Sequence, residues 1–460
     1  MAIQQMLLGA GAAEEEKYWF SELQDTSTYL KTNTEDGIGV DSDGNVYTSF
    51  RDDPPDDSAE TVNLAKWNKK GALQWQKSVN LSTTNYRRGS LHVDGSNNIY
   101  LTGMGGNSAG DGMFIFKFAS DGTLTWQRKL ATDDKMYSYG MTSDSSGNIY
   151  VTGRLTFASA SGDEHMFATK YNSSGTLQWC KHFTMSGGRV TDGQEIGVDS
   201  SDNVYIVGRI YCASCGGAWK AVLIKLNSSG AEQFNRVLTD SSEVLYGHGL
   251  TMDSSDNVYI STWSTGGGDK KLTIHKFNSS GTSQWQRKLY GTATNYNYLD
   301  DPGGLAVDSD DNIYAMRRVT RSNGHSSGQD RIGIFKYNSS GTIQWQRSYR
   351  MTDSGGSSGI GNEARFITTL GNHSIYFCLN SPETNDDNGY DLMVVKYPTD
   401  GSFTGTHGDF VIESMSYSDT AGGDSIGGES ITYNSTTTSD STTSYTVSNT
   451  SYGSATVDID

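Results

Sequence analysis

One short phrase recurs along the chain and constrains its fold more than any other feature. Its clearest copy is DSSGNIY at residues 144–150, and a worn copy at residues 372–376 is the last. The phrase closes on a tyrosine each time, at positions 47, 100, 150, 205, 259, 314 and 376, so the copies are 50 to 62 residues apart. Self-similarity at such a period indicates a repeat architecture in which each repeat is one supersecondary unit. We therefore expect seven similar units.

Each unit reads as four short strands. In the fifth unit we expect strands over residues 249–252, 257–262, 271–277 and 283–289, joined by tight turns at residues 253–256 and 278–281. The turn aspartate can accept backbone N–H bonds, and glycine or asparagine supplies a positive φ. Four-stranded units of this length, repeated seven times, are typical of propeller blades. The predicted fold is an all-β, seven-bladed β-propeller of four-stranded blades.

The two ends of the repeat array predict how it closes. The seventh unit has strands near residues 364–369, 374–379 and 391–397, but residues 401–405 replace its fourth strand. Residues 18–23 precede the first unit and have the look of a fourth strand. We expect this N-terminal strand to complete the seventh blade, which leaves no open edge. The predicted domains are a short N-terminal arm at residues 1–16, the propeller at 17–408 and a Ser/Thr/Gly-rich C-terminal appendage at 409–460.

Each of the two segments that flank the propeller has two possible interpretations. Residues 1–16 form either a frayed terminus or a docking arm that places Ile3, Met6, Leu7 and Leu8 against a partner. The C-terminal appendage contains no Lys or Arg and is rich in Ser and Thr. It is either disordered low-complexity sequence or an extended β appendage that orders against a neighbour, since its composition argues against independent folding.

The overall charge excludes several partner classes. The formal net charge is −18, whereas phosphate binding needs clustered Lys and Arg, so we expect no nucleic-acid partner. No apolar run approaches the roughly 18 residues of a membrane span, and the first residues lack the positive region of a secretory signal. We expect no membrane insertion.

A large aromatic residue and a lysine recur at fixed places in the units. We interpret the aromatic residues as packing between blades, because one such side chain buries roughly 150–250 Å². They are Trp75, Trp126, Trp179, Phe234, Trp285 and Trp345. We expect the lysines to have buried stems with their ammonium groups paired to turn carboxylates. They are Lys66, Lys117, Lys170, Lys225, Lys276, Lys336 and Lys396.

The connections between strands two and three, and between successive units, are long and differ from unit to unit. We call the end of a unit that carries them its long-loop end. Loops on a rigid scaffold are where recognition usually resides, and Tyr, Trp and Arg dominate binding hot spots. The binding residues predicted there are Tyr86, Arg88, Tyr139, Trp219, Tyr246, Trp263, Tyr296, Tyr298 and Arg321. The alternative is that these side chains only pack the loops.

Metal, redox and catalytic signals are weak. Residues 41–45 and 308–312 space oxygen ligands as calcium loops do, but no glutamate follows at position twelve, so turn chemistry is the favoured interpretation and calcium the alternative. Cys212 and Cys215 form a C-x-x-C without a second pair or a nearby histidine; we interpret them as loop and strand residues, with a local disulfide as the alternative. No catalytic constellation stands out. We expect no cofactor and no enzyme activity.

The repeat resembles a known family. The pattern D-x-x-G-N-[VI]-Y-[VIL]-[TS]-G, a lysine strand and N-S-S-G-x-x-Q-W, best seen at residues 144–153 and 167–179, resembles the SBBP-type β-propeller repeat over roughly residues 18–400. That resemblance implies the scaffold and no single activity. Quinoprotein dehydrogenases and sialidases are near misses, because the adjacent cysteine pair of the former and the Asp-box spacing of the latter are not present.

A second resemblance implies a biological setting. The opening MAIQQMLLGAG looks like the N-termini of virion structural proteins of marine tailed phages, and the C-terminal appendage is similar to the segment that comes after such repeats in those proteins. It implies a virion protein, assembled in the host cytoplasm, that displays its propeller on the tail or particle surface for assembly or host attachment. Residues 1–16 and 409–460 would contact other virion proteins, and the long-loop end a host surface glycan or protein. The alternative is a carbohydrate- or protein-binding propeller at a cell surface.

Overall fold

The structure is a computed structural model of the chain. It describes residues 18–24, 30–31, 37–52, 61–80, 86–105, 112–131, 135–156, 164–185, 188–212, 217–240, 244–266, 269–290, 298–300, 303–320, 331–351, 366–382, 390–407, 410–415, 418–421, 425–427, 431–435, 439–441, 446–449 and 453–455. These residues form strands and turns, and none of them belongs to a helix that could cross a membrane. We number the sheets 1 to 7 in the order of the repeats along the chain.

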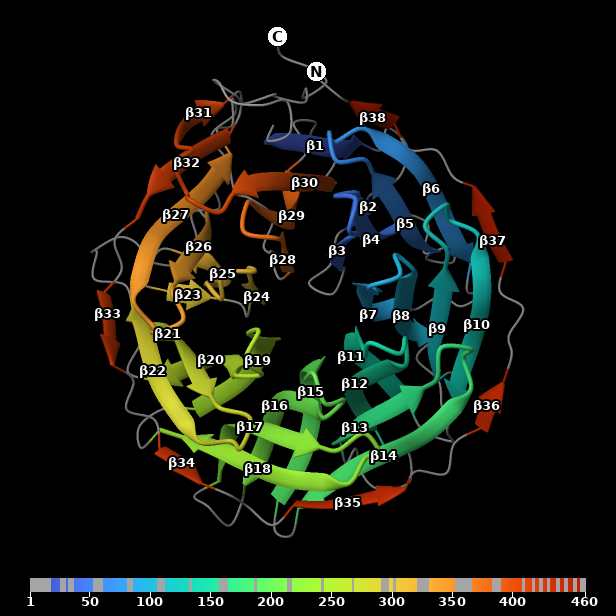
Figure 1. The fold of residues 1–460 in the computed structure, drawn as a ribbon, viewed down its shortest axis with the longest axis vertical. Coiled ribbons are helices and arrows are strands. Elements are labelled where there is room, and N and C mark those ends of the chain that lie inside the picture. Colours follow the sequence, from blue (N-terminus) through green and yellow to red (C-terminus); the bar gives the residue numbers. More distant parts are fainter. Residues whose placement is uncertain are drawn as a thin grey trace. The chain divides into compact units, whose positions relative to one another are not determined.

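The chain divides into two compact units. One comprises residues 1–84, 290–419 and 446–460 and contains sheets 1, 6 and 7. The other comprises residues 85–289 and 420–445 and contains sheets 2 to 5. Both units are built from segments that are distant in sequence, because the C-terminal residues contribute strands to each (Figure 1).

The first unit contains three sheets. Sheet 1 consists of β2 (Leu30–Lys31), β3 (Ile38–Val40), β4 (Val46–Asp52), β5 (Thr61–Trp67), β6 (Leu73–Asn80) and β37 (Thr446–Asn449). Sheet 6 consists of β23 (Tyr298–Asp300), β24 (Leu305–Val307), β25 (Ile313–Thr320), β26 (Arg331–Tyr337), β27 (Ile343–Met351), β32 (Phe410–Ser414) and β31 (Gly405–His407). Sheet 7 consists of β28 (Ile367–Leu370), β29 (Ser374–Pro382), β30 (Tyr390–Pro398), β1 (Trp19–Gln24) and β38 (Gly453–Ala455).

The second unit contains four sheets of five strands. Sheet 2 consists of β7 (Tyr86–Val93), β8 (Ile99–Gly105), β9 (Met113–Phe118), β10 (Leu124–Ala131) and β36 (Ser439–Ser441). Sheet 3 consists of β11 (Lys135–Ser143), β12 (Ile149–Thr156), β13 (Glu164–Tyr171), β14 (Leu177–Met185) and β35 (Ile431–Ser435). Sheet 4 consists of β15 (Gly188–Val198), β16 (Val204–Cys212), β17 (Ala218–Leu226), β18 (Glu232–Thr239) and β34 (Ser425–Gly427). Sheet 5 consists of β19 (Val244–Met252), β20 (Val258–Gly266), β21 (Asp269–Phe277), β22 (Ser283–Tyr290) and β33 (Ser418–Ala421).

The predicted fold class is confirmed. The chain is an all-β, seven-bladed β-propeller of antiparallel four-stranded blades, and each repeat supplies strands to one blade. The N-terminal strand completes the seventh sheet as predicted, because β1 pairs with β30 and sets Trp19 opposite Lys396. The described residues of the C-terminal appendage are extended strands, and each of β32 to β38 joins a sheet beside its last strand.

The recurring phrase forms a turn that is closed by its own side chains. In sheet 3, Asp144 Oδ1 accepts the backbone N–H groups of Ser146 and Asn148 at 3.0 and 2.9 Å. The other oxygen accepts the Asn148 amide at 2.7 Å and the Tyr150 hydroxyl at 2.9 Å. Burial and the bond to Asp144 raise the pKa of Tyr150 well above its usual value. One carboxylate therefore satisfies four donors, which explains why these residue types recur together.

The recurring aromatic residue lies on the turn of the following sheet. Trp126 donates its Nε1–H to the Ser173 carbonyl at 3.2 Å, and its ring covers Gly175, where φ is +77°. Trp179, Phe234 and Trp345 cover Gly230, Gly281 and Gly401 in the same way. Trp75 and Trp285 contact Tyr47 and Tyr259 of their own sheets, with ring centroids 6.1 and 5.8 Å apart.

The recurring lysine faces that aromatic residue across the sheet and approaches the turn aspartate. Lys276 Nζ lies 3.2 Å from Asp253 and 4.9 Å from the centre of the Tyr259 ring. In sheet 4, Lys225 Nζ lies 3.4 Å from Asp199 and donates to the Ser279 carbonyl of the next sheet at 2.9 Å. The lysine therefore connects the two turns.

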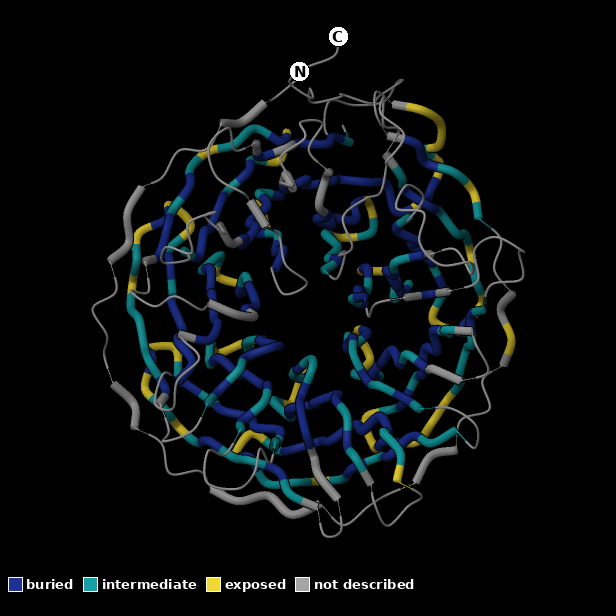
Figure 2. Tube along the Cα trace, turned by 180° about the vertical axis from the view of Figure 1, so that it is seen from behind, coloured by how far each residue is buried: buried dark blue, intermediate teal, exposed yellow. Residues whose placement is uncertain are grey.

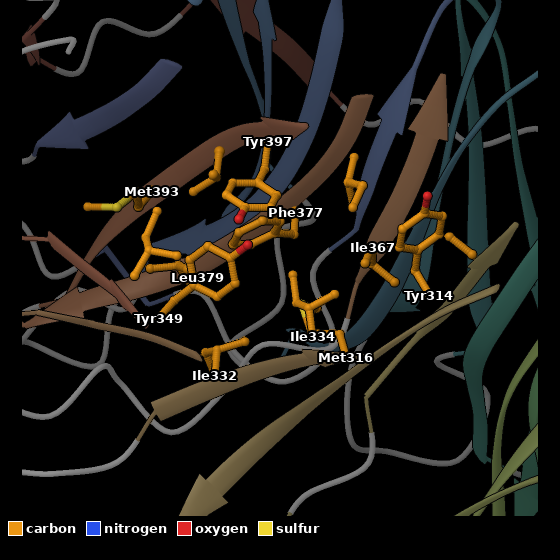
Figure 3. Packing of buried hydrophobic residues seen from close by; sticks show 14 of the residues in the cluster. Tyr314, Met316, Ile332, Ile334, Tyr349, Ile367, Phe377, Leu379, Met393 and Tyr397 are labelled. Atoms are coloured by element: carbon orange, nitrogen blue, oxygen red, sulfur yellow. The ribbon is translucent and has the colours of Figure 1, made fainter. Parts of the chain in front are cut away.

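Within each unit, the core lies between neighbouring sheets. Buried residues follow the strands, and exposed residues concentrate at the short turns (Figure 2). Between sheets 6 and 7, Tyr349 meets Phe377 and Tyr397 edge-on, with ring centroids 5.0 and 5.3 Å apart (Figure 3). Met316, Ile332 and Ile334 belong to the same cluster. This packing makes the strands a rigid support for the loops that they carry.

Candidate ligand-binding site

Each of sheets 2 to 5 pairs one residue of its first strand with one residue of its second strand near its long-loop end. One residue lies seven positions before the turn aspartate, on the first strand, and the other lies ten positions after it, on the second. The pairs are Arg87 with Met104, Tyr137 with Arg154, Asp192 with Arg209, and Tyr246 with Trp263. The surrounding backbone repeats while these side chains change, so this position is a variable site on a constant scaffold.

The first strands of sheets 2 to 5 are bulged beside these pairs. The residues passed over in the strand register include Arg88, Tyr139, Gln194 and His248. A bulge re-aims a side chain and is over-represented next to functional sites. The repeated bulge therefore supports the long-loop end as the place where recognition residues gather.

In sheet 4 the facing pair is a bidentate ion pair. Arg209 donates from Nε and Nη2 to the Asp192 carboxylate at 2.7–2.8 Å. The Asp192 side chain is fully buried, whereas 31% of the Arg209 side chain is exposed. Gln194 donates a further bond to Asp192 at 3.0 Å. Burial alone would lower the pKa of Arg209, but Asp192, with smaller contributions from Tyr139 and Tyr246, raises it, so the guanidinium remains charged.

Four aromatic side chains form a row across sheets 4 and 5, which we call the aromatic row: Tyr211, Trp219, Tyr246 and Trp263. Successive ring centroids are 5.3, 6.3 and 5.0 Å apart, and all four side chains are partly exposed. The Arg209 guanidinium lies 5.6 Å from both the Trp219 and the Tyr246 ring. Lys270 lies 5.5 Å from the Trp263 ring. These are cation–π distances, so the cations hold the rings in place.

Glycine allows sheets 3, 4 and 5 to approach closely beneath the aromatic row. A Cβ at Gly193 would lie 2.1 Å from Thr152 Oγ1 in sheet 3. A Cβ at Gly247 would lie 2.5 Å from the Gly208 carbonyl oxygen in sheet 4. Only glycine fits at these two places without moving a first strand. The facing pairs of the three sheets are therefore held at fixed separations.

Glu195 lies beside this region with an altered acidity. Its carboxyl packs against Gly140, where an added Cβ would be 2.8 Å from Oε1, and it accepts the Ile196 backbone N–H at 3.1 Å. Burial raises the pKa of Glu195 to about 8. A carboxyl that keeps its proton at neutral pH can donate a hydrogen bond. The aromatic row and Arg209 offer a ligand apolar ring faces and one fixed cation.

Three of the binding residues predicted from the sequence lie around Arg209, and a fourth, Trp263, lies against Tyr246. The three are Tyr139, Trp219 and Tyr246, and Tyr139 is the one that is largely buried. Tyr86, Arg88 and Tyr298 lie in β7 and β23, but their side chains are outside the described part of the chain. Outside it altogether lie Tyr296, Arg321, the arm residues Ile3, Met6, Leu7 and Leu8, and Cys215.

Sequence reasoning missed Asp192 and Arg209. A signal was present, because arginine occurs ten residues after the turn aspartate in four repeats. These arginines are Arg51, Arg154, Arg209 and Arg318. The recurring arginine at this repeat position therefore points to the facing pair.

The structure also gives the turn aspartates a role without an ion. The Asp41 and Asp308 carboxylates accept N–H and O–H donors from their own turns, including the hydroxyls of Tyr47 and Tyr314. In the described part of the chain, no three His, Cys, Asp or Glu side chains are grouped so that they could hold a metal ion. Hydrogen bonding thus accounts for the spacing that resembles a calcium loop.

Comparison with known proteins supports the repeat. Residues 126–154 match the SBBP family, which is described as a β-propeller repeat. No curated protein matches the sequence. Three solved structures with a similar fold are polysaccharide lyase Uly1 (TM-score 0.47, 11% identity, 85% of this chain and 94% of that one), an ulvan lyase (0.45, 9%, 82% and 94%) and a protein of unknown function from Dyadobacter fermentans (0.43, 8%, 86% and 98%). The likeness concerns the fold alone.

Proposed function

We propose that this protein is a binding propeller that recognises a glycan through the aromatic row of sheets 4 and 5. The observation that carries the proposal is the row itself, four partly exposed rings with Arg209 held between two of them. A sugar ring presents C–H groups on its faces and hydroxyls around its rim. Aromatic faces complement the former, and the Arg209 N–H groups that Asp192 does not engage complement the latter.

The proposed activity is binding without turnover. In a binding site, aromatic and arginine side chains supply most of the affinity, whereas a catalytic site also needs a positioned acid, base or nucleophile next to the ligand. Glu195 is the titratable group with the most altered acidity near the row, and its carboxyl packs against the Gly140 backbone. We assign it a structural role, and we propose that no cofactor takes part.

A glycan array followed by calorimetry tests the proposal. We expect the wild-type protein to bind a defined glycan class, and Tyr246→Ala or Trp263→Ala to weaken binding at least tenfold, a loss of about 1.4 kcal/mol. Tyr137→Ala is the matched control, because Tyr137 occupies the repeat position of Tyr246 in sheet 3 and contacts Arg154 at 4.5 Å. An equal loss in the control, or no glycan bound by the wild type, would refute the proposal.

The proposed setting is a phage virion, with the propeller displayed on the tail or particle surface and used for assembly or host attachment. It rests on the resemblance of residues 1–11 and of the C-terminal appendage to virion proteins of marine tailed phages. Residues 1–16 would then dock to another virion protein. Deletion of residues 2–12 should prevent incorporation into purified particles, as measured by mass spectrometry of the particles. Normal incorporation of the deleted chain would argue against the docking arm.

A further inference from the structure

The C-terminal appendage adds one strand to every sheet of the protein. The described strands β32 to β38 pair, in that order, with the last strands of sheets 6, 5, 4, 3, 2, 1 and 7. The partner strands are β27, β22, β18, β14, β10, β6 and β1. The appendage therefore visits the sheets in the reverse of their order along the chain, and Figure 1 shows each of these red strands beside its partner.

Backbone hydrogen bonding suits this segment to seven different partners. Residues 410–460 contain no Lys or Arg and consist largely of Ser, Thr, Gly and Asp. In sheet 3 the pairing runs antiparallel from Lys181 opposite Ser435 to Met185 opposite Ile431. Strand addition gains its affinity from main-chain bonds, so it needs no particular side chain on most of the added strand.

The first strand of the appendage is also anchored by its side chains. Ile412 is 1% exposed and belongs to the core cluster between sheets 6 and 7. Glu413 accepts bonds from Arg331 at 2.5 Å and from Arg350 at 3.1 Å. Met415 lies against Gly333, and its backbone N–H donates to the Gln346 carbonyl at 3.2 Å. Thus β32 fixes the start of the appendage to sheet 6.

Without the appendage, each sheet would end in an exposed edge. The partner strands are six to nine residues long, which is long enough to template pairing with another chain. A second copy of this chain would offer edge strands of the same length and sequence, so it is the partner best matched to them. Covering an edge is a known way to prevent such association.

We propose that residues 410–455 act as an autoinhibitory strand array that prevents the outer sheet edges from pairing with a second copy of this chain. The contacts of Ile412 and Glu413 with sheet 6 are its anchor. Release of that anchor uncovers sheet 6 first and then allows the pairings of β33 to β38 to open in turn. The exposed edges then join edges of another copy by strand addition.

Hydrogen exchange and light scattering on the full-length chain test this proposal. In the wild type we expect slow exchange of the backbone amides in β32 to β38 and a constant molar mass across a concentration series. Glu413→Arg places a third positive charge beside Arg331 and Arg350. It should speed exchange in β32 roughly tenfold or more and produce larger species as the concentration rises. Ile412→Asp should do the same through the core.

A matched control separates the anchor from general charge effects. Asp43→Arg makes the same charge change at an exposed turn position of sheet 1, so it should leave exchange in β32 and the molar mass unchanged. Exchange in β12 reports that the sheets remain folded in each variant. Fast exchange of the appendage in the wild type would overturn the proposal. A released appendage in a variant that stays monomeric at every concentration would also overturn it.

Discussion

At the scale of single residues, burial and hydrogen bonding decide what each polar group can do. The turn aspartates are buried and saturated with donors, so they act as structural acceptors. His275 is a buried basic group, in contrast to these buried acids. Its side chain in β21 is fully buried, and Nε2 lies 3.0 Å from Thr262 Oγ1. Burial, and then the charge of Lys288, lower the pKa of His275 to about 3, so it is neutral in the folded protein.

His275 should make stability depend on acidity. Between pH 3 and pH 6.5 the unfolded chain binds a proton that the folded chain does not, so this residue's contribution decreases as the pH falls below 6.5. At pH 5 the loss amounts to about 2 kcal/mol. His275→Gln should remove this acid-induced loss of stability. The free energy of opening sheet 5, from native-state hydrogen exchange at pH 7 and pH 5, measures it. An equal acid loss in variant and wild type would contradict the assignment.

At the scale of elements, contacts between a fourth strand and the next turn join neighbouring sheets. The Trp126 ring of β10 covers the turn between β13 and β14 because Gly175 has no side chain and a positive φ. Gly147, in the other short turn of sheet 3, has nearly the same φ of +74°, but its nearest neighbour is Ser173 Cβ at 3.4 Å. The two glycines share a backbone conformation and differ in what lies above them.

These glycines separate backbone strain from the ring contact. Gly147→Ala should cost about 1–2 kcal/mol, the penalty of a left-handed conformation for an L-residue. Gly175→Ala should cost about 1–3 kcal/mol more, because its Cβ would lie 2.9 Å from the Trp126 ring and force it to move. Urea unfolding followed by tryptophan fluorescence measures both variants. Equal destabilisation would mean that the ring adjusts freely and contributes little to the contact between sheets.

At the scale of the whole molecule, distant segments complete the sheets. The seventh repeat lacks the fourth-strand tryptophan, and Trp19 of β1 supplies it. Trp19 faces Lys396 as Trp345 faces Lys336, and it donates to the Lys69 carbonyl of the sheet 1 turn at 3.0 Å. The N-terminal strand thus reproduces the repeat contact between sheets 7 and 1 within their unit.

Closure by this strand predicts a large effect of one substitution. Trp19 is fully buried, so Trp19→Ala should destabilise its unit by about 3–5 kcal/mol. Trp19→Phe keeps most of the ring volume and loses only the bond to Lys69, so its effect should be smaller. Differential hydrogen exchange of β30 and β6 measures the loss. Unchanged protection in Trp19→Ala would show that the closing strand is dispensable.

Sequence reasoning predicted the repeat number, the turns, the strand order and the closing strand because each depends on residues that are adjacent or periodic. Asp144, Gly147, Asn148 and Tyr150 specify their turn within seven positions. It did not predict the Asp192–Arg209 pair, because those residues are 17 positions apart and meet only when β15 and β16 pair. It assigned Trp219, Tyr246 and Trp263 to one end of the repeats without indicating that their rings form a row.

The sequence by itself determined that this protein is a seven-bladed propeller closed by its N-terminal strand, since turn chemistry and periodicity are local. Only the tertiary structure decided where its aromatic rings converge and what its C-terminal residues do. The physical reason differs between the two. The row depends on the close approach of separate sheets, which Gly193 and Gly247 allow. Strand addition by β32 to β38 depends on backbone groups that every residue carries, so a Ser- and Thr-rich sequence does not reveal it.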